Sequence, residues 1–389
     1  MGRKINCVKN GKEYYRVTVS IGRDSNGKLI RKEFYGSSKK DAENKRDEYL
    51  DNIKKGLNVD YKNIVLGELM HSWLFEIVRV SNQIKPSTFQ RYEGIYRNYV
   101  KNSDIYGLRI SNLKTIHLQR YYNSLYTKGK TSNVIKNLNK LLKNFFNYAT
   151  DEGYILKNPC SGKRIVIPGE TETQERKIEV FSDKEINTLK VALKGHRLKF
   201  LILLALGTGL RQGELLGLKW SDIDINNKQL KVERSIKQVN IISADESKEY
   251  KTIVQSPKSK NSIRTVPIPS NLISDLKEHR KLQKQEKLKS GNSYNDTDYV
   301  FTTEVGNTMN ARNITKSYKR LLKKAKIPYK KFHSLRHTYA TKLFEVNVPL
   351  KTVQMLLGHS DISITANIYT HVMPKEKIKA VEKLNNLFA

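Results

Sequence analysis

The chain has 389 residues, with 72 Lys and Arg against 38 Asp and Glu, and therefore a formal net charge of +34 at pH 7. An excess of this size indicates a polyanionic partner, and nucleic acid is the commonest one. Solubility is a weaker explanation, because acidic residues improve it more than basic residues do. The longest apolar run, FLILLAL, is too short to span a bilayer, and the N-terminus lacks the apolar stretch of a signal peptide. With only Cys7 and Cys160, far apart, the sequence predicts a cytoplasmic protein without disulfides or membrane insertion.

The first sixty residues are predicted to form a small sheet and one helix. YYRVTVSIG and LIRKEFYG are β-rich runs, and the Asn-Gly pair between them predicts a hairpin over residues 14–36. The pattern then becomes helical, with Ser38 as predicted N-cap, Asp41 three residues later and Gly56 as predicted stop.

Residues from about 64 to 165 are predicted to be wholly helical. PSTFQRYEGIYRNYV begins with Pro86 and a predicted Ser87 cap, and its aromatic residues recur at helical steps. TSNVIKNLNKLLKNFFNYATDEG is apolar on one face and carries lysines on the others. The predicted core positions of these two helices are Phe89, Tyr92, Tyr96, Tyr99, Ile135, Leu138, Leu142, Phe145 and Phe146.

The polar stretch after residue 165 contains Pro and Gly and predicts an interdomain linker over 166–178. Beyond it, 179–389 is predicted to be a helical domain with one β-rich insert. In that insert, strands over KQLKVERSIK and TIVQSPKSKNSIRTVPIP are joined by a long polar loop. The fold class is therefore multidomain and mainly α, with small sheets.

HSLRHTYATKLF places His333 and His337 four residues apart, the spacing of a zinc-binding pair on a helix. Zinc is excluded, because Ser334 stands where a metalloprotease helix needs a glutamate. No suitably spaced Cys or His supplies a third ligand either. Arg336 on the same helix favours a phosphate instead.

Phosphodiester chemistry needs guanidinium groups for the phosphate charge, a nucleophile and a proton donor for the leaving oxygen. Three stretches of the C-terminal half supply such residues: LGTGLRQGELLGLKW, HSLRH and LLGHSDISITANIYTH. In the first, a local Arg-Glu ion pair is the structural alternative. In the third, a Gly before His is a predicted helix C-cap. The candidates are Arg211, Glu214, His333, Arg336, His359 and Tyr369.

In this chain order the motifs resemble those of the tyrosine recombinase (phage integrase) family, Arg…Lys…His-x-x-Arg…His/Trp…Tyr. TGLRQGELLGL, HSLRHTYAT and LLGHSDISITANIYTH look like its signature boxes. The first 165 residues are similar in layout to integrases of temperate phages and conjugative transposons. The resemblance implies the tyrosine recombinase fold, with an arm-type DNA-binding domain at 1–60, a helical, SAM-like core-binding domain at 64–165 and a catalytic domain at 179–389.

The resemblance also implies roles for individual residues. Arg211 and Arg336 would bind the scissile phosphate, and His359 would hydrogen-bond it. Tyr369 would attack phosphorus and form a 3′-phosphotyrosyl link, while Glu214 would position the site. Because the pKa of tyrosine is near 10, the two arginines would favour its phenolate electrostatically.

Proton transfer is assigned on the same resemblance. Lys258, in the turn PKSKNS, would protonate the departing 5′ oxygen, although the nearby Lys260 remains an alternative. His333 would be the acid/base histidine. No metal and no ATP are expected, because arginine supplies the charge that a metal ion supplies elsewhere.

The implied enzyme is a site-specific DNA recombinase that integrates or excises a mobile element, phage or conjugative transposon. Its implied partners are double-stranded DNA attachment sites, other copies in a tetramer on DNA, and an excisionase or DNA-bending accessory protein. The implied location is the bacterial cytoplasm, at the nucleoid when bound. PKEKIKAVEKLNNLF would pack on a neighbouring copy or within its own chain. A catalytically inactive DNA-binding regulator and a type IB topoisomerase are the alternatives.

Further DNA contacts are expected from basic side chains outside the catalytic motifs. Each is a DNA contact or an ordinary solvated charge, and the sequence leaves both open. These residues are Arg16, Arg31, Lys32, Lys136, Lys140 and Lys143.

Overall fold

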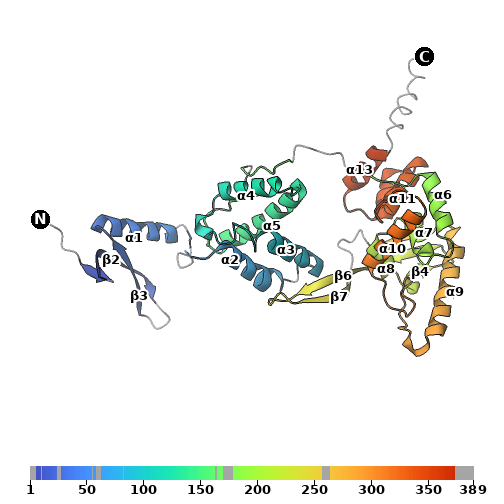
Figure 1. The fold of residues 1–389 in the computed structure, drawn as a ribbon, viewed down its shortest axis with the longest axis horizontal. Helices are drawn as coiled ribbons and strands as arrows, with labels where there is room; N and C mark the ends of the chain where they lie inside the picture. The colour runs from blue at the N-terminus through green and yellow to red at the C-terminus, as the bar shows by residue number, and fades with distance from the viewer. Residues whose placement is uncertain are drawn as a thin grey trace, which may run out of the picture. The chain divides into compact units, whose positions relative to one another are not determined.

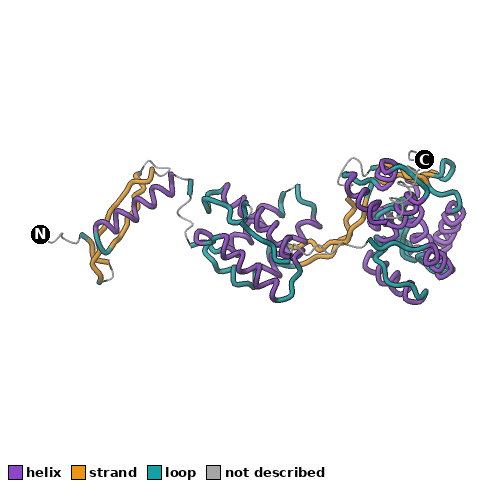
Figure 2. Tube along the Cα trace, turned by 90° about the horizontal axis from the view of Figure 1, so that it is seen from above, coloured by secondary structure: helices purple, strands orange, loops and turns teal. Residues whose placement is uncertain are grey.

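The structure is a computed structural model in which helices predominate and the sheets are small (Figures 1 and 2). It separates into two compact units, residues 1–173 with 242–247, and residues 174–241 with 248–389. The division into three domains and a linker, drawn from the sequence, stays a prediction. The residues described are 6–9, 11–23, 28–54, 56–57, 63–81, 83–162, 164–169, 178–255 and 263–372.

The first unit begins with an antiparallel sheet of order β1-β2-β3, followed by a helix along it. Tyr49 of that helix is buried against Phe34 of the sheet. The amide of Asp41 donates to Ser38 Oγ at 3.1 Å, so both the strand pairing and the N-cap predictions are confirmed. The elements are β1 (Cys7–Lys9), β2 (Lys12–Arg23), β3 (Leu29–Gly36) and α1 (Lys39–Lys54).

The remainder of the first unit is helical, as predicted. The predicted core positions in its long helices are buried or partly buried. The Ser87 cap is wrong, because the helix begins one residue earlier at Pro86, whose fixed φ suits the first helical position. The elements are α2 (Leu66–Ser72), a π-helical turn η2 (Trp73–Val78), α3 (Pro86–Tyr99), a 3₁₀ turn η3 (Ile110–Asn112), α4 (Thr115–Thr127) and α5 (Ser132–Asp151).

The second unit packs its helices around a large apolar core. The apolar run that begins at Phe200 forms the centre, and its helix contacts α8, α9 and α11. The helices are α6 (Asp183–Ala192), α7 (Lys199–Thr208), α8 (Gln212–Gly217), η4 (Trp220–Asp222), α9 (Leu272–Ser290), η6 (Gly291–Ser293), α10 (Ala311–Lys324), α11 (Ser334–Glu345), α12 (Leu350–Leu357) and α13 (Ile362–Val372).

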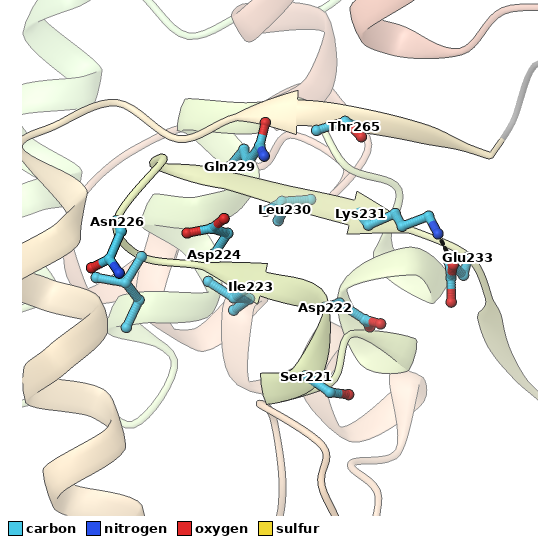
Figure 3. Close-up of a pocket in the computed structure, with 11 residues that line it drawn as sticks. Ser221, Asp222, Ile223, Asp224, Asn226, Gln229, Leu230, Lys231, Glu233 and Thr265 are labelled. Carbon is cyan, nitrogen blue, oxygen red and sulfur yellow. Dashed lines mark ion pairs between the residues drawn. The ribbon is translucent and has the colours of Figure 1, made fainter.

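A three-stranded antiparallel sheet in the second unit has the order β4-β5-β8. Its strands alternate, so that Leu230 and Val266 face the core while Lys231 and Thr265 face outward. Figure 3 shows these outward side chains beside a pocket that also takes in η4. None of the candidate catalytic residues that the structure describes lines that pocket. The strands are β4 (Ile223–Asp224), β5 (Gln229–Val232) and β8 (Arg264–Pro267).

The predicted long polar loop of the β-rich insert is wrong. Two strands, β6 (Ser235–Ile242) and β7 (Lys248–Gln255), pair over most of that stretch. Val239 and Ile242 are buried, so apolar burial outweighs the polar composition of the segment. The turn between the strands groups with the first unit, where Ile242 joins the apolar core.

Candidate active site

Arg211 is fixed in place by a sharp change of chain direction. Helix α7 ends at Gly209, which has a φ of +63°, a conformation that glycine adopts without steric strain. Arg211 then caps α8, and its backbone amide donates to Glu214 Oε2 at 3.0 Å. Its Nη1 donates to Glu214 Oε1 at 2.7 Å. The guanidinium is therefore oriented by Glu214 while its side chain stays 37% exposed to solvent.

Arg336 lies on α11 and is almost completely buried, with 2% of its surface exposed. Its Nη1 donates to the carbonyl oxygen of Gly209 at 2.8 Å, and its Nη2 to that of Leu357 at 2.6 Å. The first bond ties α11 to the turn before Arg211, and the second ties it to the end of α12. A buried guanidinium with oriented donors is the group expected to hold a phosphate.

His359 follows the end of α12 directly. Gly358 has a φ of +65° and terminates the helix, which confirms the predicted C-cap. Its carbonyl oxygen accepts a longer bond, 3.4 Å, from Arg211 Nη2. His359 is 8% exposed, and its Nδ1 lies 2.9 Å from the hydroxyl of the buried Thr365. The three motifs therefore meet at the carbonyl end of one helix.

The charges of this cluster act on one another. Burial, then repulsion by Arg211, lowers the pKa of Arg336 below that of a free guanidinium. Burial alone would raise the pKa of Glu214, but the charges and hydrogen bonds of Arg264 and Arg211 outweigh it and lower that pKa below its usual range. A carboxylate is thus kept ionised between cationic groups.

The histidines of the site are held neutral near pH 7. Burial, followed by repulsion from Arg336 and Arg211, lowers the pKa of His359 to about 3. Packing around its ring, then the His337 and arginine charges, lowers the pKa of His333. His333 as a whole is exposed, so the effect there is weaker on physical grounds than at His359. The rings of His333 and His337 meet edge to face, with centroids 4.7 Å apart.

Tyr369 lies on α13, which packs against α11 and α12. Its ring contacts Phe344 edge to face with centroids 5.1 Å apart, and the residue is 41% exposed. Within the described part of the chain, no hydrogen bond joins its hydroxyl to either arginine of the site. Its predicted role as nucleophile therefore stays a prediction, as do the roles of the other site residues.

Lys258 and the alternative Lys260 lie outside the described residues, in the segment between β7 and β8. The predicted amphipathic segment that follows α13, residues 374–388, also lies outside them. The assignment of Lys258 as proton donor, with Lys260 as the alternative, therefore stays a prediction.

The basic residues of the N-terminal sheet fall on two different faces. Arg16 lies on β2 and Arg31 on β3, both exposed, and Arg16 Nη1 pairs with Glu33 at 3.2 Å. Lys32 faces the other way, and its ammonium stands 4.5 Å from the centre of the Tyr49 ring on α1. The open face therefore presents two of the three candidates, and Lys32 packs toward the helix.

The three lysines of α5 lie on one exposed face. Lys136, Lys140 and Lys143 are four and three residues apart, opposite buried positions such as Leu138 and Leu142. Lysines in this arrangement could contact successive DNA phosphates or could be solvated side chains. The assignment to DNA stays a prediction.

One charged residue close to the site was not identified from the sequence. Arg264, the first residue of β8, contacts Glu214, and its side chain is 7% exposed. The sequence could have indicated it, because Arg264 lies two residues before the buried Val266 in a short strand. Residues two apart in a strand face the same side of the sheet.

Three general features of the described chain concern metal ligands, membrane spans and cysteines. Within the described ranges, no group of three or more His, Cys, Asp and Glu side chains has a metal-binding arrangement. Among the helices that the structure describes, none is long and apolar enough to cross a membrane. Cys7 and Cys160 are free thiols.

Two protein-family models match the chain. The model described as phage integrase family matches residues 179–376, and the model of the phage integrase N-terminal SAM-like domain matches residues 65–126. The first match contains Arg211, Arg336 and Tyr369 in the order given above.

Similar proteins indicate the same family. The chain is 66% identical over 392 residues to the XerC-like tyrosine recombinase of Caldanaerobacter subterraneus, covering 100% of both chains. It is 27% identical to the integrase of Staphylococcus phage L54a, covering 86% of this chain and 98% of that one. The fold is that of the Tn1549 transposon integrase, with a TM-score of 0.66 and 19% identity over 82% of this chain and 99% of that chain. The chain therefore belongs to the phage integrase family of tyrosine recombinases, which are site-specific DNA recombinases.

Proposed function

We propose that this recombinase integrates or excises a mobile element by cleaving and rejoining DNA through a 3′-phosphotyrosyl intermediate at Tyr369. The observation that carries the proposal is the meeting of Arg211 and Arg336 at the carbonyl end of α12, beside His359. Guanidinium groups approaching from two elements suit the two non-bridging oxygens of one phosphodiester.

In the proposed reaction, the Tyr369 oxygen attacks phosphorus and the 5′ oxygen of the DNA leaves. His333 accepts the phenolic proton, and Lys258 donates a proton to the departing oxygen. Arg211, Arg336 and His359 stabilise the negative charge that builds up on the phosphoryl oxygens. Because the bond energy is kept in the phosphotyrosyl link, a 5′ hydroxyl from another strand can reverse the reaction without ATP.

The electrostatics of the site support these assignments. A histidine whose pKa is lowered is neutral at pH 7 and can accept a proton, which suits His333 as a base. Tyr369 is 41% exposed, and its hydroxyl makes no hydrogen bond within the described residues. No internal bond has to break before it meets a phosphate. Arg211, Arg336 and His359 supply the stabilisation for which other enzymes use a metal ion, so we propose no metal and no ATP.

The proposed partners are double-stranded DNA attachment sites, further copies of the chain in a tetramer on DNA, and an excisionase or DNA-bending protein. The net charge of +34 supports DNA as the substrate, as does the solved complex of the Tn1549 integrase with circular-intermediate DNA. We place the protein in the bacterial cytoplasm, at the nucleoid when it is bound.

Trapping the covalent intermediate tests the proposal. Nicked duplexes tiled across the DNA that flanks the coding sequence lose a short fragment after cleavage, so the link cannot be reversed. We expect an adduct that survives SDS, migrates with the protein, and is absent with Tyr369→Phe.

An adduct of equal yield with Tyr369→Phe would show that the nucleophile is another residue. Two duplexes with different end labels, each carrying the cleaved site, then separate the activities. Exchange of labels is expected of a recombinase. Relaxation of a supercoiled plasmid that carries the site, without exchange of labels between the duplexes, would indicate a topoisomerase.

A further inference from the structure

Arg264 is a third arginine of the catalytic cluster, and its position in β8 explains why it points inward. In the antiparallel register it lies opposite Val232, whose side chain is buried, whereas the next residue, Thr265, lies opposite the exposed Lys231. Figure 3 shows Thr265 beside the pocket at the outer surface of the sheet. Strand alternation therefore directs the Arg264 side chain to the core side of the sheet, where it is 7% exposed.

Arg264 shares Glu214 with Arg211. Its Nη2 donates to Glu214 Oε2 at 3.0 Å, and its Nη1 lies 3.4 Å from Oε1. The same two oxygens accept from the backbone amide and Nη1 of Arg211. The carboxylate side chain, only 6% exposed, is thus clamped between an inner arginine and an outer one. Removing the inner partner would leave a buried charge half compensated and free to rotate.

Arg264 also holds the end of α12. Its Nε donates to the carbonyl oxygen of Leu356 at 2.7 Å. The next two carbonyl oxygens, of Leu357 and Gly358, accept from Arg336 and Arg211. The last carbonyls of a helix lack partners within the helix and carry its negative dipole end. Three guanidinium groups therefore occupy three consecutive carbonyls, immediately before His359.

We propose that Arg264 is a positioning residue for strand cleavage, holding Glu214 against Arg211 and the end of α12 beneath His359. This inference rests on the proposed function, because it assigns Arg264 to the same phosphate site. Arg264 does not itself meet the phosphate. It fixes the spacing of the groups that do.

Single-turnover cleavage of the nicked duplex at saturating protein tests this role, because DNA affinity then does not limit the rate. We expect Arg264→Gln to slow cleavage about 100-fold, the scale of loss from misplacing a catalytic group by about 1 Å. Arg264→Lys keeps the charge but cannot reach Glu214 and Leu356 together, so we expect partial rescue. Arg197→Gln is the matched control. Arg197 also bridges a carboxylate, that of Glu286, and a backbone carbonyl, but neither partner belongs to the catalytic cluster. We therefore expect Arg197→Gln to leave the cleavage rate unchanged.

A second substrate separates positioning from plain loss of structure. A methylphosphonate at the scissile position has a methyl group in place of one non-bridging oxygen and carries no negative charge. Because a neutral group depends less on aligned guanidinium groups, we expect the Arg264→Gln deficit, relative to the original chain on the same duplex, to shrink about tenfold or more. An equal deficit on both substrates would overturn the proposal.

The double variant Glu214→Gln/Arg264→Gln removes both members of the buried Arg264–Glu214 pair, so neither partner of that pair is left without the other. Because part of the effect of Arg264 passes through Glu214, we expect the double variant to lose less than the product of the two single deficits. The role of Arg264 would be refuted if the deficit of the double variant equalled the product of the two single deficits. It would also be refuted if both Arg264 variants cleaved at the normal rate. Absence of any adduct with the original chain would instead refute the proposed function.

Discussion

Replacing His359 by Asn should make the catalytic unit less sensitive to acid. Asn keeps a polar atom near the position of Nδ1, so the bond with Thr365 can be retained, but it does not take up a proton. In the folded chain, burial and the nearby arginine charges lower the pKa of His359 to about 3. In the unfolded chain a histidine has a pKa of about 6.5.

The sign and size of this effect on the free energy of unfolding follow from proton linkage. Below pH 6.5 the unfolded chain binds a proton at His359 that the folded chain rejects, so the free energy of unfolding falls as the pH drops toward 3. Between pH 7 and pH 5 this one residue accounts for a loss of about 2 kcal/mol. The loss is absent above pH 7, where both states are neutral.

Urea unfolding at pH 7 and pH 5 measures the effect. The two tryptophans lie in different units, so a Trp73→Phe background leaves Trp220 as a fluorescent reporter of the second unit. The change in unfolding free energy between the two pH values should be about 2 kcal/mol smaller with His359→Asn than without it. Comparing the difference between pH values removes any constant effect of the substitution.

Equal pH dependence in the two proteins would refute the reasoning. It would mean that His359 is solvated in the folded chain, or that the arginine charges do not act on it. The placement of His359 beside Arg336 would then be wrong as well.

Four further results are expected. Gly209→Ala forces a side chain into the left-handed region and brings its Cβ within 2.4 Å of the Tyr339 ring, so thermal unfolding should show a loss of at least about 1 kcal/mol; an unchanged midpoint would contradict the described turn. Arg336→Lys leaves one buried carbonyl unpaired, so urea unfolding should register a loss of about 1–3 kcal/mol, together with slower cleavage. Phe146→Ala should destabilise the first unit by about 3–5 kcal/mol and leave the Trp220 transition unchanged. DNA affinity measured against salt should fall with a log–log slope of about −0.9 per phosphate neutralised, and a flat response would argue against backbone contacts.

Local patterns in the sequence were sufficient for much of the fold. The Asn-Gly turn signal and β-rich runs predicted the pairing of β2 with β3, and Ser38 with Asp41 predicted the start of α1. Apolar periodicity identified the buried face of α5, and Gly358 the end of α12. These features depend on residues within one or two turns of each other, so the sequence contains the whole interaction.

The strand pairing of β6 with β7 could not be read in the same way. Much of its segment is polar, and the burial of Val239 and Ile242 accompanies the formation of β6 there. That burial depends on which surfaces lie next to it, and a propensity argument does not include them.

The sequence by itself determined which residues are candidates for the site, among them two arginines, two histidines and a tyrosine in a recognisable order. Only the tertiary structure decided that Arg211 and Arg336 end at neighbouring carbonyls of α12, and that Arg264 stands behind them. The reason is that a guanidinium finds its partners through space. The carbonyl groups at the end of a helix have no partners within the helix, and the sequence does not show which distant donors will bind them.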